Sequence, residues 1–467
     1  MELKDFKCLG SGVHGVIYGA TMNGNKYAIK CWKVSSQIKA GHVNIKELDM
    51  YKNLSHPNIV GNCEVIPYKL IKDKVKEKGR IDKFCIMYKR GLCNLQDHMK
   101  SISSFPSMLS QLLQGLDYLH KNGIVHRDIK SNNILLYPND NYKIIDYGLS
   151  KFLCNLSSRN STGIGTKDYM APELLLSKRD YKFGVDIWSL AIICIESLLG
   201  RIPFVKVRGD SSYNRCIKIF EFLGYPTDDI LSLYFDNPLP ITDRKDFNIK
   251  RSLPFTDDQK KKIGDVEAFY DLLSKMLSYD YKNRISAEEC LNHPYFNNKC
   301  TIYKLPDDNR LFEAVNSKYK TEGYKVFQIY HATEYQDEFI KKYKDRILFL
   351  GLDIYERCFI VKLEGSPWHI AYSSIYIAYK YYLDFHLVGI SELFPKVHNI
   401  TRDLRKLEKV ILSKVLKFSI FRKSIYEWIP TSEISKKRID QVFDMITNGS
   451  DDIMGLNLKE IGAAIIE

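Results

Sequence analysis

The chain begins with a pattern of hydrophobic and polar positions that is typical of β-strands. Short apolar stretches alternate with glycines and polar residues through Leu9–Val16, and the stretch Lys26–Lys30 (KYAIK) follows shortly afterwards. This pattern predicts a hairpin followed by a further strand. Later in the chain, Ser189–Leu199 is an apolar run, which favours a buried helix.

The pattern changes after Phe296. The polar stretch Asn297–Arg310 leads into a region whose apolar residues recur at helical spacing, with few strand signals. We therefore expect a domain boundary here. The first domain would cover residues 1–298, a linker residues 299–309, and an all-α domain residues 310–467.

One helix of the C-terminal region is predicted more strongly than its neighbours. Ile347, Leu350 and Ile354 recur at helical spacing, followed by Cys358 and Val361. Residues 366–367 (Ser-Pro) then provide an N-cap and a first turn. The helix that follows, residues 368–382, is apolar nearly all round, which is typical of the central helix of a bundle.

Composition narrows the class of protein. The 467 residues are 45% hydrophobic and 27% charged, which is ordinary for a globular protein long enough for two or three domains. No stretch approaches the roughly 20 apolar residues of a membrane span, and the first residues lack the apolar core of a signal peptide. The 11 cysteines include no C-x-x-C pair. We therefore expect an intracellular protein, cytoplasmic or nuclear, with reduced thiols and no membrane partner.

The formal net charge of +13 does not by itself indicate a nucleic-acid partner. Part of this charge lies in the run Lys69–Lys83 (KLIKDKVKEKGRIDK). A run of this kind is usually a solvated hairpin. We therefore do not expect nucleic acid among the partners.

Candidate chemistry begins in the first predicted hairpin, where G-x-G-x-x-G is followed by valine. The residues of this loop are Leu9, Gly10, Ser11, Gly12, Val13, His14, Gly15, Val16 and Ile17. The glycines would let the hairpin lie flat over a triphosphate, and Lys30, in the A-I-K strand that begins at Ala28, could then reach the α- and β-phosphates. Glycines can also mark a mere turn, so the pair favours a nucleotide site without establishing it.

The segment His126–Asn133 (HRDIKSNN) is the most specific motif in the chain. It matches H-R-D-x-x-x-x-N without a gap. Phosphoryl transfer needs a carboxylate to accept the proton of the attacking hydroxyl, a role that fits Asp128. It also needs an amide oxygen to help hold Mg²⁺, a role that fits Asn133. A buried polar turn would explain any one of these residues but not the whole set.

A second candidate metal ligand follows the apolar strand Lys143–Ile145. The sequence Asp146-Tyr147-Gly148 resembles D-F-G, in which the aspartate is the main Mg²⁺ ligand. Tyr147 stands where phenylalanine is usual. It keeps an aromatic ring for packing but adds a hydroxyl that needs a partner.

Together these motifs resemble those of the protein kinase family. Further landmarks of the family follow in order: Ala171-Pro172-Glu173, Asp186–Ser189, Asp280–Arg284 and His293–Phe296. The resemblance covers about residues 1–298. It implies an α+β bilobal fold, with a β-rich lobe over about 1–90, a helical lobe over about 91–298, and ATP and Mg²⁺ between them. It also implies that Arg284 pairs with Glu173.

Two residues place the chain in the serine/threonine branch of this family. In that branch a lysine and a threonine hydrogen-bond around the catalytic base, and Lys130 and Thr166 match them. The alternative is an inactive family member that serves only as an interaction protein. Because every catalytic group is present, we expect an active enzyme with protein substrates.

Glu47 is the candidate partner of Lys30, because family members need this ion pair to hold the phosphates. A solvated helix glutamate is the alternative. The segment Gly41–Glu47 and the later LSHPNIV of Leu54–Val60 resemble the cyclin-dependent kinases, with Ile45 matching the isoleucine that plugs into the cyclin.

Other positions bear on how such a kinase would be switched. Ser161 and Thr162 are candidate phosphorylation sites in the activation segment, and a phosphate there could pair with Arg127. Residues 13 and 14 replace the inhibitory threonine and tyrosine of many relatives, so that brake should be absent. Met170 replaces a common arginine, which leaves open a preference for proline after the target residue.

The C-terminal region carries a second resemblance, to the cyclin box, over about residues 310–420. Residues 375–382 (IYIAYKYY) look like its A-x-K-Y signature, and residues 407–412 (LEKVIL) look like its E-x-x-I-L helix. Lys380 and Glu408 match the lysine and glutamate that in cyclins grip the backbone before the kinase's regulatory helix. An ordinary helical bundle with surface charges is the alternative.

These resemblances imply a cyclin-dependent-like serine/threonine kinase fused to its own activator. An intramolecular contact between the cyclin-like domain and residues 41–47 would hold Glu47 against Lys30, unless two chains exchange these domains. Such a fusion would also fit a viral protein acting in its host cell. The alternative is a docking or scaffold module that recruits substrates without altering catalysis.

Overall fold

The computed structural model describes two compact units of the chain. Its described residues are 3–12, 15–33, 45–75, 81–152, 165–204, 211–235, 244–296 and 367–382, with a few single positions between 327 and 411. The first unit comprises Met1–Lys33, Leu54–Leu153 and Ser157–Leu305, and the second comprises Val34–Asn53, Cys154–Leu156 and Pro306–Glu467. The segment 34–53 therefore groups with the C-terminal region rather than with its neighbours in sequence.

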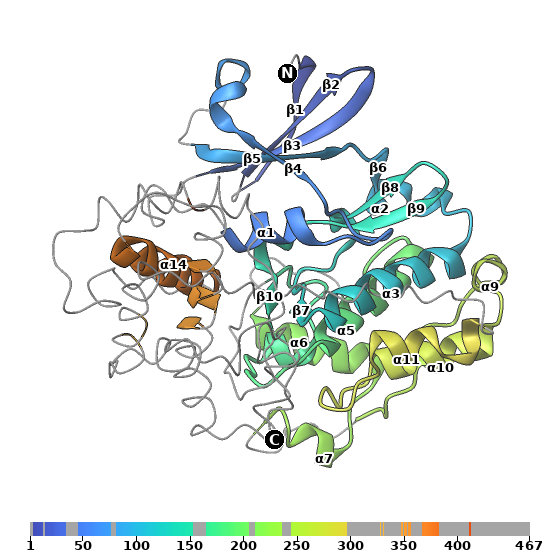
Figure 1. Ribbon diagram of the computed structural model, residues 1–467. Coiled ribbons are helices and arrows are strands. Elements are labelled where there is room, and N and C mark those ends of the chain that lie inside the picture. The colour runs from blue at the N-terminus through green and yellow to red at the C-terminus, as the bar shows by residue number, and fades with distance from the viewer. Residues whose placement is uncertain are drawn as a thin grey trace. The chain divides into compact units, whose positions relative to one another are not determined.

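Strands dominate the beginning of the chain and helices the later part (Figure 1). The strands are β1 (Lys4–Ser11), β2 (Gly15–Met22), β3 (Asn25–Lys33), β4 (Glu64–Pro67), β5 (Ile81–Lys89), β6 (Cys93–Asn94), β7 (Ile124–Val125), β8 (Ile134–Tyr137), β9 (Asn141–Ile144) and β10 (Lys151–Phe152). The helices are α1 (Ile45–Asn53), α2 (Leu95–His98), α3 (Phe105–Lys121), α4 (Pro172–Leu175), α5 (Gly184–Leu199), α6 (Ser212–Leu223), α7 (Asp228–Leu231), α8 (Ile249–Ser252), α9 (Asp257–Ile263), α10 (Val266–Met276), α11 (Ala287–Leu291) and α14 (Pro367–Tyr382). Short 3₁₀ turns cover Tyr68–Leu70, Lys72–Lys74, Met99–Ser101, Ser131–Asn133, Tyr147–Leu149 and Pro294–Phe296.

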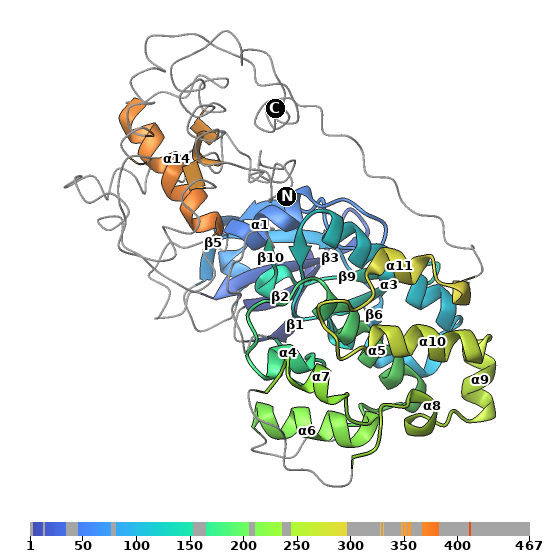
Figure 2. The ribbon, with the colours of Figure 1, turned by 90° about the horizontal axis from the view of Figure 1, so that it is seen from below.

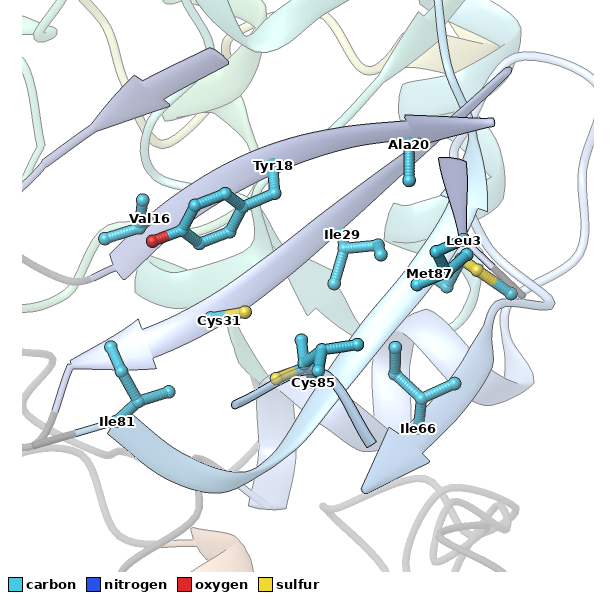
Figure 3. Packing of buried hydrophobic residues seen from close by; sticks show 11 residues of the cluster. Leu3, Val16, Tyr18, Ala20, Ile29, Cys31, Ile66, Ile81, Cys85 and Met87 are labelled. Atoms are coloured by element: carbon cyan, nitrogen blue, oxygen red, sulfur yellow. The ribbon is translucent and has the colours of Figure 1, made fainter. Parts of the chain in front are cut away.

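The first five strands form one antiparallel sheet in the order β1-β2-β3-β5-β4. Strands β2 and β3 meet in a two-residue turn, Asn23-Gly24, whose φ values of 50° and 77° suit asparagine and glycine. One face of the sheet buries a cluster of apolar side chains (Figure 3). The cluster includes Val16, Tyr18 and Ala20 from β2, Ile29 and Cys31 from β3, Ile66 from β4, and Ile81, Cys85 and Met87 from β5.

The helical part of the first unit is organised around α5. Every residue from Val185 to Leu198 in this helix is buried, and Gly200 ends it with a φ of 72°. Both α3 and α10 pack against α5, and α11 packs against α3 (Figure 2). Side-chain caps fix where several of these helices begin: Ser104 accepts a hydrogen bond from Ser107 N at the start of α3, and Ser286 forms a capping box with Glu289 at α11.

In the second unit, α14 is buried over most of its length. All its residues from Ile370 to Tyr379 are buried. Gly351 approaches it so closely that an added Cβ would lie 3.2 Å from Ile375 Cα. The helix α1 belongs to the same unit and contacts α14.

The structure tests several of the sequence predictions directly. The hairpin of β1 and β2, the following strand β3, the buried helix at 189–199 and the apolar helix ending at Tyr382 are confirmed. The expected hairpin at Lys69–Lys83 is confirmed: this run joins β4 to β5, which pair antiparallel up to Pro67 and Phe84. Its described part forms two 3₁₀ turns before β5 begins at Ile81. The predicted linker and most of the region after residue 310 lie outside the described residues, so the all-α domain and its boundaries stay predictions.

Candidate active site

The carboxylate of Asp128 lies within a ring of hydrogen-bond donors. Its Oδ1 accepts from Thr166 N at 3.0 Å and from Thr166 Oγ1 at 2.7 Å. Its Oδ2 accepts from Lys130 Nζ at 2.7 Å and from Asn133 Nδ2 at 3.0 Å. Lys130 Nζ also donates to Thr166 Oγ1 at 2.8 Å, which closes the ring. The structure thus brings together four residues that the sequence singled out, from segments 36 positions apart.

Backbone contacts hold this loop in an unusual conformation. Arg127 has a φ of 67°, which costs free energy in a residue other than glycine. The buried carboxylate of Asp186, at the start of α5, accepts from His126 N at 2.8 Å and from Arg127 N at 2.9 Å. Burial opposes ionisation of Asp186, but its hydrogen bonds, first of all with His120, lower its pKa. In the sequence, Asp186 stands out only as a landmark of the family, and its anchoring role is not predictable from the motif.

The next candidate is Asp146, in the loop after β9, which pairs with Lys30 on β3. Lys30 Nζ lies 2.6 Å from Asp146 Oδ1. Burial would raise the pKa of Asp146, but the Lys30 ammonium outweighs it and lowers that pKa to about 2. Asp146 itself has a φ of 70°. The carboxylate of Asp146 is therefore ionised, partly exposed and fixed next to Lys30.

The donor chemistry of Asp146 and Asn133 fits Mg²⁺. The amide nitrogen of Asn133 donates to Asp128 O at 2.9 Å as well as to its carboxylate, so the amide oxygen is the atom able to coordinate a metal. Mg²⁺ usually binds one or two protein carboxylates together with substrate phosphates rather than a cage of protein ligands. One carboxylate and one amide oxygen match that requirement.

The glycine-rich loop is described except for residues 13 and 14. Gly12 N donates to Gly15 O at 2.9 Å, which pairs the described residues on either side of that gap. At Gly15 an added Cβ would lie 2.6 Å from Cys31 O, so no side chain fits there. Ser11 Oγ accepts from Lys33 Nζ at 2.8 Å, a contact that sequence patterns did not suggest. Of the other loop positions, Leu9 is 38% exposed and Val16 fully buried, and Ala28, on β3, is buried too.

Residues 165–173 follow the candidate base along the chain, and close contacts fix both ends of this segment. At Gly165 φ is 110°, and an added Cβ would collide with the backbone oxygen of Arg127. At the other end Arg284 donates to Glu173 from Nη1 at 2.6 Å and from Nη2 at 3.0 Å, and both side chains are at most 1% exposed. The pairing of Arg284 with Glu173 is confirmed.

A buried polar network between these ends was not foreseen from the sequence. Tyr169 OH lies 2.9 Å from Ser131 Oγ and donates to Glu196 Oε2 at 2.8 Å. Burial raises the pKa of Glu196. The network ties the catalytic loop to α5, and only the tertiary fold brings its members together.

The regulatory candidates are only partly described. Glu47 is 1% exposed and lies in α1, in the second unit, whereas Lys30 lies in the first, so their pairing stays a prediction. Arg127 Nε donates to Leu149 O at 2.7 Å and its Nη1 to Tyr181 OH at 3.2 Å. Ser161, Thr162 and Glu408 lie outside the described residues, as do the side chains of Ile45 on α1 and Lys380 on α14.

Comparison with known proteins agrees with this geometry. The protein kinase domain family matches residues 3–296, well over half of the chain, so the chain belongs to the protein kinase family. The chain is 31% identical over 329 residues to cyclin-dependent kinase D-1 of Arabidopsis thaliana, covering 69% of this chain and 79% of the relative. It is 32% identical over 296 residues to cyclin-dependent kinase 1 of Encephalitozoon cuniculi, covering 62% and 94%. It is 30% identical over 341 residues to cyclin-dependent kinase 7 of Xenopus laevis, covering 69% and 92%.

The family and these relatives identify the chain as a serine/threonine protein kinase, a class that uses ATP and Mg²⁺ and phosphorylates proteins. Within the described residues, no helix is both long and apolar enough to cross a bilayer.

Proposed function

We propose that this kinase transfers the γ-phosphate of ATP to serine and threonine hydroxyls with Asp128 as its catalytic base. The observation that carries this proposal is the ring of donors from Thr166, Lys130 and Asn133 around the Asp128 carboxylate. These donors fix the direction of both carboxylate oxygens, so that the base needs no reorganisation when it accepts the hydroxyl proton. Lys130 also supplies a positive charge beside the position at which the phosphoryl group would be attacked.

Lys30, Asp146 and Asn133 are the residues that we propose for the nucleotide and metal. The Lys30 ammonium would contact phosphate oxygens, and the Asp146 carboxylate and Asn133 amide oxygen would hold Mg²⁺. When bound, Mg²⁺ neutralises charge on the phosphates during transfer. Because Lys30 lies 2.6 Å from Asp146 Oδ1, both groups are already directed to one place.

We further propose that the C-terminal region is a cyclin-like activator of the kinase domain. Two observations support this: α1 and α14 belong to one compact unit and contact each other, and Glu47 on α1 is 1% exposed. The relatives named cyclin-dependent kinases make an activator that acts on this helix a natural candidate. A domain that fixes α1 would also fix Glu47, and with it the ion pair to Lys30. We also propose that the protein is intracellular. We further propose that a phosphate on Ser161 or Thr162 pairs with Arg127.

The activator can be tested in the full chain with Lys380→Ala combined with Glu408→Ala. Activation predicts a lower kcat on every peptide substrate, because the loss lies in the kinase domain itself. A matched control is Lys250→Ala with Glu267→Ala, which removes an exposed lysine–glutamate pair elsewhere in the first unit and should leave kcat unchanged.

The outcomes separate the activator from a docking module. A docking module predicts wild-type turnover on short peptides and losses only on particular protein substrates. Wild-type activity on all substrates would refute the assignment of Lys380 and Glu408. Full activity of a fragment ending near residue 300 would refute activation by the C-terminal region altogether.

A further inference from the structure

The hydroxyl of Tyr147, next to the proposed metal ligand, has a specific partner. Tyr147 is 1% exposed, and its OH donates to the backbone oxygen of Val60 at 2.7 Å. Its ring packs edge-on against His126, with the centroids 5.8 Å apart. Burial raises the pKa of Tyr147 well above its usual value, so the hydroxyl keeps its proton and remains a donor. The side chain is therefore held at both its ring and its tip.

The partner of this hydroxyl lies in a rigid piece of backbone. Val60 N donates to Ile144 O at 2.8 Å, and Ile144 N donates to Asn58 O at 2.9 Å, so residues 58–60 pair with the end of β9. Asn58 Nδ2 reinforces this pairing by donating to Tyr142 O at 3.0 Å. The next residue is Gly61, where an added Cβ would collide with Leu54 O. The carbonyl of Val60 thus has little freedom to move.

Asp146 needs such support from its neighbours. Its φ of 70° lies in the left-handed region, which a residue with a side chain adopts only when the surroundings hold it there. On one side, Ile145 N donates to Asn133 O at 2.9 Å, and Ile145 O lies 2.9 Å from His126 Nε2. On the other side the support comes from Tyr147, whose hydroxyl is bonded 87 positions back along the chain.

We infer that the hydroxyl of Tyr147 is a positioning group for Asp146: its bond to Val60 holds the aspartate in the conformation that binds the metal. This rests on the proposed role of Asp146 as a Mg²⁺ ligand. With phenylalanine at 147 the ring packing would remain, but the Val60 carbonyl would lose its donor and the turn at Asp146 would lose one of its anchors. The segment 54–60, which supplies the Val60 carbonyl, directly follows α1 along the chain.

The test is the Tyr147→Phe variant of the full chain, measured by metal binding as well as by activity. Mn²⁺ is titrated in the presence of a non-hydrolysable ATP analogue, and free Mn²⁺ is followed by electron paramagnetic resonance. Loss of one hydrogen bond should weaken metal binding by about three- to tenfold. The KM for a peptide substrate should stay unchanged, because no substrate-facing group is altered.

The matched control is Tyr142→Phe. Tyr142 is also 1% exposed and lies on β9, but its hydroxyl has no hydrogen-bond partner among the described residues. This variant should bind Mn²⁺ within about twofold of wild type. A purely structural role for the Tyr147 hydroxyl would lower the melting temperature of Tyr147→Phe without changing its metal affinity.

Wild-type Mn²⁺ affinity in Tyr147→Phe would overturn the inference, whatever happens to the melting temperature. A separate variant, Asp146→Asn, distinguishes this failure from failure of the proposed function. If Asp146→Asn binds Mn²⁺ as tightly as wild type, the role of Asp146 is wrong and the inference falls with it. If only Asp146→Asn is impaired, the metal ligand stands and the role of the Tyr147 hydroxyl is refuted.

Discussion

Thr166 donates to Asp128 Oδ1 twice, once from its backbone nitrogen and once from its hydroxyl, and the two bonds can be separated by mutation. Thr166→Val keeps the shape and the backbone donor but removes the 2.7 Å hydroxyl bond. It also removes the acceptor of the 2.8 Å bond from Lys130 Nζ. A hydrogen bond to a charged group contributes about 1.5–3 kcal/mol. We therefore expect kcat to fall by roughly 10- to 150-fold, since each 1.4 kcal/mol is a factor of ten.

Steady-state kinetics with a peptide substrate measures this effect. The KM for ATP should stay within about twofold of wild type, because Thr166 has no proposed contact with the nucleotide. The control is Thr166→Ser, which retains the hydroxyl and should keep most of the activity. The reasoning is refuted if Thr166→Val retains wild-type kcat, or if Thr166→Ser is as slow as Thr166→Val.

Two further predictions concern stability. Arg284→Met leaves Glu173 buried without its partner and should lower the free energy of unfolding by about 3–5 kcal/mol in urea titrations. Adding Glu173→Gln should restore part of that loss, and simple additivity would contradict the pairing. Burial, with a smaller contribution from Lys143, lowers the pKa of His56 to about 4. As the pH falls, the His56 imidazole is therefore protonated in the unfolded chain before it is protonated in the folded chain. Stability should fall by up to about 3 kcal/mol as pH drops from 6.5 to 4, and an unchanged slope in His56→Asn would contradict this.

The parts of the site that the sequence predicts are those that short motifs specify. H-R-D-x-x-x-x-N places Asp128 and Asn133 on one loop, and the family resemblance extends the prediction to Thr166 and Lys130. The contact between Arg284 and Glu173 was also predictable, although 111 positions separate them, because the resemblance supplies both members. For the fold, the alternating and helical spacing of apolar residues was sufficient to predict β2, β3, α5 and α14.

Other features depend on which distant segments pack against each other, and the pattern of residues in one sequence does not indicate this. The bond between Tyr147 and Val60 requires the bridge between Ile59 and Ile144, and nothing local to either segment indicates it. The three-way anchoring by Asp186 arises in the same way. The two 3₁₀ turns in Lys69–Lys83, between the paired strands β4 and β5, were not predicted either, because charge density does not specify the type of turn.

Phosphate transfer by this chain requires Asp128 to act as the base in a working nucleotide site. The most direct measurement compares wild type with Asp128→Asn in the full chain, with radiolabelled phosphate transfer from ATP to a serine/threonine protein substrate and ATP binding recorded on the same samples. We predict that Asp128→Asn binds ATP with wild-type affinity but transfers phosphate at least about 100-fold more slowly. Undiminished transfer by Asp128→Asn would contradict the role of Asp128 as catalytic base.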